Sequence, residues 1–153
     1  MVFLAKDEES LSYHEKALEL FRAVGSREGE ALILMAMGAR YNATDQTQKA
    51  RESFEEALSV SHAAGFRHGE ASALVALGLF FSYLLDVQKA LKYYELALPL
   101  FRAERDPVGE SITLHGLCIN YLSSRDYQIG FDYCNQALAL LHATGIVNAK
   151  PSH

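Results

Sequence analysis

The sequence repeats itself with a period of 40 residues, and this period constrains the fold more than any other feature. The segment FRAVGSREGE at residues 21–30 returns as SHAAGFRHGE at residues 61–70 and as FRAERDPVGE at residues 101–110. The segments between them also align at this spacing, and each carries apolar residues three and four apart, as an amphipathic helix does. Each block therefore predicts a pair of helices.

A two-helix unit that cannot cover its own apolar face must stack on its neighbour. The period therefore predicts an all-α fold, an α-solenoid of antiparallel helix pairs with about seven helices. We expect these helices near residues 8–24, 27–42, 46–64, 67–82, 86–104, 107–122 and 126–143.

The ends of the expected helices carry recognisable signals. Asp106 and Pro107 supply an N-cap and the first helical position, where proline is tolerated. The glycines that follow expected second helices mark their ends; these are Gly25, Gly65 and Gly145. Pro99 lies inside an expected helix, which it should bend or end early.

The first two repeats share a pattern of small and aromatic residues. Repeat one has Leu34, Gly38 and Tyr41, then Ala50, Phe54 and Ala57; repeat two has Leu74, Gly78 and Phe81, then Ala90, Tyr94 and Ala97. The pattern resembles the tetratricopeptide repeat family, in the longer 40-residue form seen in kinesin light chains and bacterial signalling proteins. HEAT-type repeats are the alternative architecture, because their period is similar.

The resemblance covers nearly the whole chain and implies a right-handed superhelix. Repeat three departs from it, with Cys118 in place of glycine, Gly130 in place of alanine and Cys134 in place of an aromatic residue. We expect one domain over residues 1–153, made of an orphan second helix (7–24), three full repeats (27–64, 67–104 and 107–143) and a tail (144–153).

The expected repeat array has no polar capping helix at either end. Residues 1–6 align with residues 41–46, so they should form the last turn of a first helix. We expect an excised piece of a longer protein, which self-associates or forms a homodimer through its unprotected repeat ends.

Composition excludes several classes of partner. The chain is 50% hydrophobic and 22% charged, with a net charge of -5, so it has no electrostatic reason to bind nucleic acid or a membrane surface. It shows no signal peptide. Two cysteines are too few for a disulfide scaffold and lack the spacing of a zinc site. A cytoplasmic location is the plain expectation.

No motif for catalysis, cofactor binding or metal binding stands out, so we expect a protein that is not an enzyme. Cys118 and Cys134 fall at core positions, which favours inert packed thiols over a redox switch. His115 should face the inner surface, where no neighbouring Ser, Cys or Asp would make it a catalytic base.

The repeats also carry paired charges near their junctions. Arg22, His62, Arg102 and His142 should lie in the last turns of second helices, and Glu30, Glu70 and Glu110 in the first turns of the helices that follow. Both placements complement the helix dipole, so a structural role is expected.

A mostly apolar groove is the expected binding surface, because first helices line the concave side of such solenoids. The expected groove residues are Leu32, Met35, Ala39, Asn42, Ser72, Val75, Leu79, Tyr83, Ile112, His115, Ile119 and Leu122. The cations with which some family members hold a peptide carboxylate are missing here.

The sequence therefore predicts a scaffold for protein–protein interaction. It would bind an apolar or amphipathic peptide segment, with Met35, Leu79 and Ile119 as anchors, as the regulatory part of a larger signalling protein. The alternative is a structural or oligomerisation segment whose groove is filled by its own chain or by a second copy.

Overall fold

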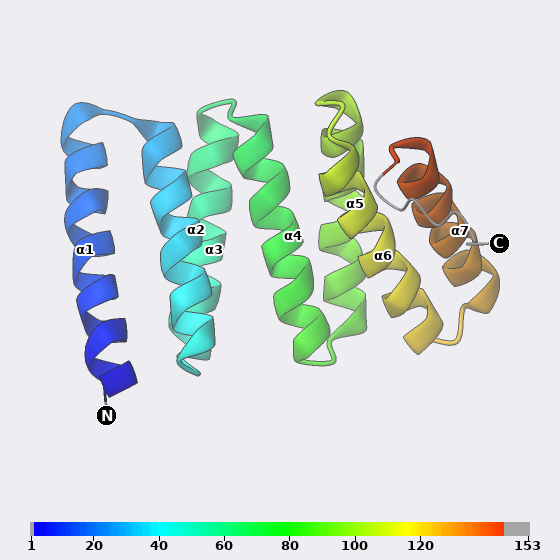
Figure 1. The fold of residues 1–153 in the computed structure, drawn as a ribbon, viewed down its shortest axis with the longest axis horizontal. Coiled ribbons are helices and arrows are strands. Elements are labelled where there is room, and N and C mark those ends of the chain that lie inside the picture. Colours follow the sequence, from blue (N-terminus) through cyan, green and yellow to red (C-terminus); the bar gives the residue numbers. More distant parts are fainter. Residues whose placement is uncertain (1, 146–153) are drawn as a thin grey trace, which may run out of the picture. The chain divides into compact units, whose positions relative to one another are not determined.

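The structure, a computed structural model, describes residues 2–145, and this part of the chain consists of helices and short turns. Its seven helices are α1 (Val2–Val24), α2 (Arg27–Ala43), α3 (Thr47–Ala63), α4 (Arg67–Tyr83), α5 (Val87–Ala103), α6 (Pro107–Ser123) and α7 (Tyr127–Ala143). Figure 1 shows them in chain order. The all-α helix-pair fold predicted from the 40-residue period is confirmed.

Six helices begin and end within one residue of their expected positions, and α1 differs. It begins at Val2 rather than at residue 8, so residues 2–6 belong to the same helix as Leu18 and do not end a preceding one. The physical reason is that no glycine or proline interrupts this run. Of the expected tail, residues 146–153 lie outside the described residues.

Pro99 does not end α5, which continues to Ala103. Phe101, beyond the proline, is buried against α6, where a Cβ added at Gly109 would lie 2.2 Å from its ring. This packing favours a helical last turn despite the one hydrogen bond that proline removes.

The capping signals act as expected. The side chain of Asp106 accepts hydrogen bonds from the backbone N–H groups of Val108 and Gly109 at 3.1 and 3.0 Å. Gly25, Gly65 and Gly145 have φ values of 71°, 67° and 69°, which suit glycine after a helix.

The chain divides into two compact units, Met1–Ala73 and Leu74–His153. In the first unit, α1 to α3 and the start of α4 share a core of Leu18, Leu34, Met37, Ala57 and Ala73. Gly38 lies where a Cβ would approach the Phe54 ring to 2.6 Å, so a glycine on the first helix leaves room for an aromatic ring on the second.

In the second unit, Tyr94 is the largest fully buried side chain. It extends from α5 and lies against two glycines, since a Cβ added at Gly78 of α4 or Gly116 of α6 would lie 2.9 or 2.4 Å from its ring. Leu77, Leu114 and Leu117 of the same unit are also fully buried. One aromatic ring therefore joins its own repeat to the first helix of the next.

Candidate interaction surface

An exposed apolar stripe lies on the first helices of the second unit. Leu79 of α4 is 50% exposed and Tyr83 is 89% exposed, and α6 adds exposed Ile112 and Ile119. The two helices are joined near their C-terminal ends, where the Asn120 amide donates to the Ser82 hydroxyl at 2.9 Å.

The predicted groove residues differ in how open they are. Exposed members are Leu32, Ala39 and Asn42 of α2, Leu79 and Tyr83 of α4, and Ile112, His115 and Ile119 of α6; half-buried members are Met35, Ser72, Val75 and Leu122. Those up to Ser72 belong to the first unit and the others to the second.

Two of the half-buried members make contacts inside their own unit. Met35 packs on the core of the first unit, and Leu122 lies against α7, where a Cβ at Gly130 would be 2.7 Å from its side chain. Both can offer a partner only part of their surface, so Leu79 and Ile119 are the more accessible of the three expected anchors.

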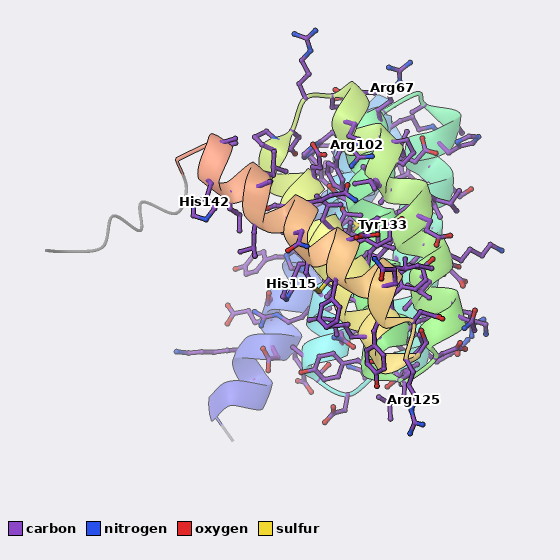
Figure 2. All side chains as sticks on the ribbon, turned by 90° about the vertical axis from the view of Figure 1, so that its right-hand side faces the viewer. Arg67, Arg102, His115, Arg125, Tyr133 and His142 are labelled. Atoms are coloured by element: carbon purple, nitrogen blue, oxygen red, sulfur yellow. A yellow bond between two sulfur atoms is a disulfide. The ribbon has the colours of Figure 1, made fainter. Side chains whose placement is uncertain are left out.

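A mostly apolar cavity of about 490 Å³ opens between α6 and α7. Its lining comes from both helices: Ser111, Ile112, His115, Cys118, Cys134, Ala137, Leu138 and Leu141. Figure 2 looks towards this part of the chain and shows His115 beside α7. Sequence reasoning placed Ile112 and His115 on a surface but did not predict the cavity.

The two cysteines form a disulfide, so the expectation of inert free thiols is wrong. Cys118 of α6 and Cys134 of α7 have Cα atoms 5.1 Å apart, within the usual range for such a bond. The signal was available in the repeat register. These cysteines align with Gly78 and Tyr94, which interlock, so the two positions had to face each other.

The charged residues at the repeat junctions pair with one another. Arg22 lies 3.0 Å from Glu30, and Arg102 lies 2.8 Å from Glu110. The Nδ1 atom of His62 lies 3.0 Å from Glu70 in the same arrangement. Sequence reasoning placed these groups at helix ends but did not predict the pairs. Each pair connects residues eight positions apart and so joins a second helix to the first helix that follows it.

The Arg22 and Arg102 side chains reach one helix further. Arg22 also lies 2.7 Å from Glu56, and Arg102 donates to the Gln136 side chain at 3.1 Å. These contacts hold repeat neighbours in register, which supports the structural role expected for them.

Two tyrosines of the second unit have raised pKa values. The hydroxyl of Tyr121 donates to the Glu95 carboxylate, and this bond, with partial burial, raises the pKa of Tyr121. Burial raises the pKa of Tyr94, while a hydrogen bond with Ser82 acts in the opposite direction.

Within residues 2–145, no three His, Cys, Asp or Glu side chains gather in a way that could hold a metal ion. None of the helices in this same range is long and apolar enough to cross a membrane.

Solved structures of low sequence identity share this fold. BtubC (BKLC) from P. vanneervenii matches with a TM-score of 0.81 at 20% identity over 97% of this chain. The apo form of RapI matches with a TM-score of 0.85 at 18% identity over 94%. Aspartyl phosphate phosphatase F from Bacillus subtilis matches with a TM-score of 0.76 at 18% identity over 89%.

This chain spans only part of each of these proteins: 62% of BtubC, 53% of RapI and 36% of the phosphatase. Comparison with the curated proteins found no match.

The fold is that of a helical-repeat scaffold, an α-solenoid built from successive helix pairs. Residues 2–63 match the model of the tetratricopeptide repeat family, and the solved structures of BtubC and RapI share the fold of the described chain. The resemblance predicted from the sequence is therefore confirmed.

Proposed function

We propose that this chain is a non-enzymatic interaction module that binds an apolar or amphipathic segment of another protein along its first helices. The observation that carries the proposal is the exposed stripe of the second unit, in which Leu79, Tyr83 and Ile119 present apolar surface on two helices joined through Ser82 and Asn120. Contiguous exposed apolar surface in a folded domain marks an interaction site.

The residues around the stripe favour a helical or extended apolar segment over a charged one. The hydroxyl of Tyr83 and the imidazole of exposed His115 can add polar contacts to this apolar surface. In the first unit, exposed Leu32, Ala39 and Asn42 supply a similar apolar face with one polar group.

A regulatory role within a larger signalling protein fits the same surface. Two structural neighbours are RapI and aspartyl phosphate phosphatase F, and this chain spans 53% and 36% of them. The fold likeness supports a scaffold role here and gives no reason to assign phosphatase chemistry to these residues.

The test compares two leucines of equal exposure. Leu79 on first helix α4 and Leu96 on second helix α5 are each 50% exposed, so Leu79→Glu and Leu96→Glu disturb the fold to a similar degree. Proteins cross-linked to the chain in its native cell extract are identified for wild type, and their binding to each purified variant is then measured.

We expect Leu79→Glu to weaken partner binding at least tenfold and Leu96→Glu to leave it within a factor of two, because only the first places a charge in the stripe. Equal binding by both variants would refute the stripe assignment. If Leu79→Glu instead abolishes self-association, measured by light scattering, the groove is filled by a second copy and the structural alternative holds.

A further inference from the structure

The turn between α4 and α5 (Figure 1) presents three consecutive apolar residues to solvent. Tyr83, at the end of α4, is 89% exposed, and Leu84 and Leu85 in the turn are 53% and 85% exposed. Described helices precede α4 and follow α5, so this turn belongs to the middle repeat of the array. Its exposure therefore does not depend on where the sequence begins or ends.

The aligned turns of the other two repeats carry polar residues. They consist of Ala43, Thr44 and Asp45 in repeat one and of Ser123, Ser124 and Arg125 in repeat three. The Thr44 hydroxyl donates to the Arg40 carbonyl oxygen at 3.1 Å, and the Ser124 hydroxyl donates to the Tyr121 carbonyl oxygen at 3.0 Å. These bonds satisfy carbonyl groups at the end of a first helix, and the side chain of Leu84 has no group that could replace them.

The backbone of Leu85 adds a second cost to this turn. Its φ is 60°, in the left-handed region that residues with a Cβ disfavour and that asparagine and glycine tolerate best. The Leu85 N–H donates to the Ser82 carbonyl oxygen at 3.1 Å, which holds the turn in this conformation. Repeat two therefore carries leucines at two positions where they lower the stability of the fold, and it presents both in a fixed arrangement.

The exposed apolar surface of the turn is continuous with the stripe of the proposed function. Leu79 and Tyr83 lie one helical turn apart on the same face of α4, and both are exposed. Leu84 and Leu85 follow Tyr83 directly along the chain. A segment that covers Leu79 and Tyr83 therefore meets further apolar surface at the C-terminal end of α4.

The charges around this surface favour an uncharged partner segment. Residues 71–83 and 111–123, which form most of α4 and α6, contain no Asp, Glu, Lys or Arg. Beside the turn, the Asp86 carboxylate accepts a hydrogen bond from the Lys89 backbone N–H at 3.3 Å and lies 3.6 Å from the Lys89 ammonium. The carboxylate nearest to the two leucines is thus already paired within the chain.

We propose that the partner segment continues past the C-terminal end of α4 and packs on the α4–α5 turn, where Leu84 and Leu85 are further binding residues. This inference rests on the proposed function, because it extends the same stripe. The occupant is an uncharged apolar segment of the partner protein, long enough to cover both the stripe and the turn. Binding sites commonly retain residues that cost the fold stability, and apolar groups held in a fixed turn lose little freedom when a partner covers them.

The test separates binding from folding by means of the left-handed residue. Leu85→Asn removes the apolar side chain and supplies a residue that tolerates this backbone conformation. Arg125→Asn is the matched control, because Arg125 occupies the aligned place in repeat three with a φ of 67°. The binding probe is the purified partner identified by cross-linking in the test of Leu79→Glu. Urea midpoints report folding, and calorimetric titration gives the Kd.

Leu85→Asn should raise the urea midpoint and weaken partner binding at least about fivefold. Arg125→Asn should also raise the midpoint but leave the Kd within about twofold of wild type. Leu84→Thr, which restores the hydroxyl present in repeat one, should weaken binding without lowering the midpoint. Unchanged binding by Leu85→Asn would overturn the proposal. A lower midpoint would overturn it too, because Leu85 would then serve the fold.

A second measurement asks whether the stripe and the turn contact one segment. A photoreactive amino acid, p-benzoylphenylalanine, replaces either Leu79 or Leu85, and mass spectrometry locates its cross-links on the purified partner. Both positions should link to one continuous stretch of the partner. Links to separate stretches, or no link from position 85, would contradict a segment that continues past α4.

The inference and the proposed function can fail separately. Weaker binding by Leu79→Glu together with unchanged binding by Leu85→Asn would remove the inference and leave the proposed function. An effect of Leu85→Asn alone would make the turn a separate site and refute the continuous surface. A wild-type chain that captures no partner, or two variants that bind as wild type does, would refute both.

Discussion

Repeats two and three join their two helices in different ways at the same pair of aligned positions. In repeat two, Gly78 and Tyr94 interlock by shape, and in repeat three, Cys118 and Cys134, 16 residues apart, are bonded covalently. The Tyr94 ring also reaches Gly116 of the following helix, whereas the disulfide joins only α6 and α7. A packed ring can therefore serve two interfaces at once, and a short covalent link serves one and leaves a cavity beside it.

The largest expected effect comes from removing the ring of repeat two. Tyr94→Ala should lower the free energy of unfolding of the second unit by about 3–5 kcal/mol, because it empties a fully buried aromatic site that two glycines are shaped around. Urea unfolding followed by circular dichroism measures this. Tyr83→Ala, at an 89% exposed position, should change it by no more than about 0.5 kcal/mol. Equal losses of unfolding free energy in Tyr94→Ala and Tyr83→Ala would contradict the conclusion that the Tyr94 ring joins two interfaces.

Reducing the disulfide should lower the free energy of unfolding somewhat less than Tyr94→Ala does. The bond closes a loop of 16 residues, and a loop of this length corresponds to about 3 kcal/mol of stability in the chain-entropy model. Urea midpoints measured with and without a reductant give the effect on wild type. The variant with both Cys118→Ser and Cys134→Ser should show the reduced midpoint and no response to reductant. A wild-type midpoint that ignores reductant after verified thiol release would show that packing alone holds α6 to α7.

The sequence predicts the elements of this comparison unevenly. Repeat spacing places Gly78 opposite Tyr94, since a small residue must lie where a large one approaches, and this interlocking is observed. The same register applied to Cys118 and Cys134 predicts contact, but a pattern of buried positions does not distinguish a thiol pair from a disulfide. The bond depends on a Cα separation of 5.1 Å, which only coordinates supply.

The candidate surface was harder to predict than the helices. Helix ends follow local signals such as Asp106 and Gly65, so they were placed within one residue for six helices. Exposure depends on what neighbouring helices cover, and Leu122 is half-buried because glycine replaces alanine at position 130. The start of α1 was missed because residues 2–6 were assigned by alignment to a different helix.

A smaller effect is expected where the repeats differ in the turn after a second helix. Gly65 and Gly145 have positive φ values, and Arg105 occupies the aligned place in repeat two with a φ of 52°. A left-handed residue with a Cβ costs roughly 1–2 kcal/mol, and glycine's greater freedom in the unfolded chain offsets roughly 0.4–1 kcal/mol of that gain. Arg105→Gly should therefore stabilise the second unit by about 0.5–1 kcal/mol.

Arg105→Ala is the control for the loss of the side chain, because alanine keeps the Cβ and its backbone cost. Urea unfolding should rank Arg105→Gly above wild type and leave Arg105→Ala at or below it. If both variants gain equally, the arginine side chain rather than the backbone is the source of the effect.

The smallest expected effect concerns alkaline pH and the stacked aromatic pairs. Repeat two stacks Tyr93 on Phe81, and repeat three stacks Tyr133 on Tyr121, whose hydroxyl donates to Glu95. This bond raises the pKa of Tyr121 above its ordinary value of 10.0 in the folded chain. The folded state therefore holds the proton more tightly than the unfolded state, so the contribution to stability is present below pH 10 and declines as pH rises beyond it.

Tyr121→Phe makes the repeat-three pair resemble that of repeat two and removes this contribution. At pH 8 wild type should have the higher urea midpoint, and the difference should shrink steadily between pH 10 and pH 12, because the hydroxyl of the unfolded chain loses its proton there while the native hydroxyl retains it. Tyr83→Phe removes an exposed hydroxyl instead and should follow wild type at every pH. A difference in urea midpoint between wild type and Tyr121→Phe that stays constant with pH would mean that stacking, and not the hydrogen bond to Glu95, distinguishes the two pairs.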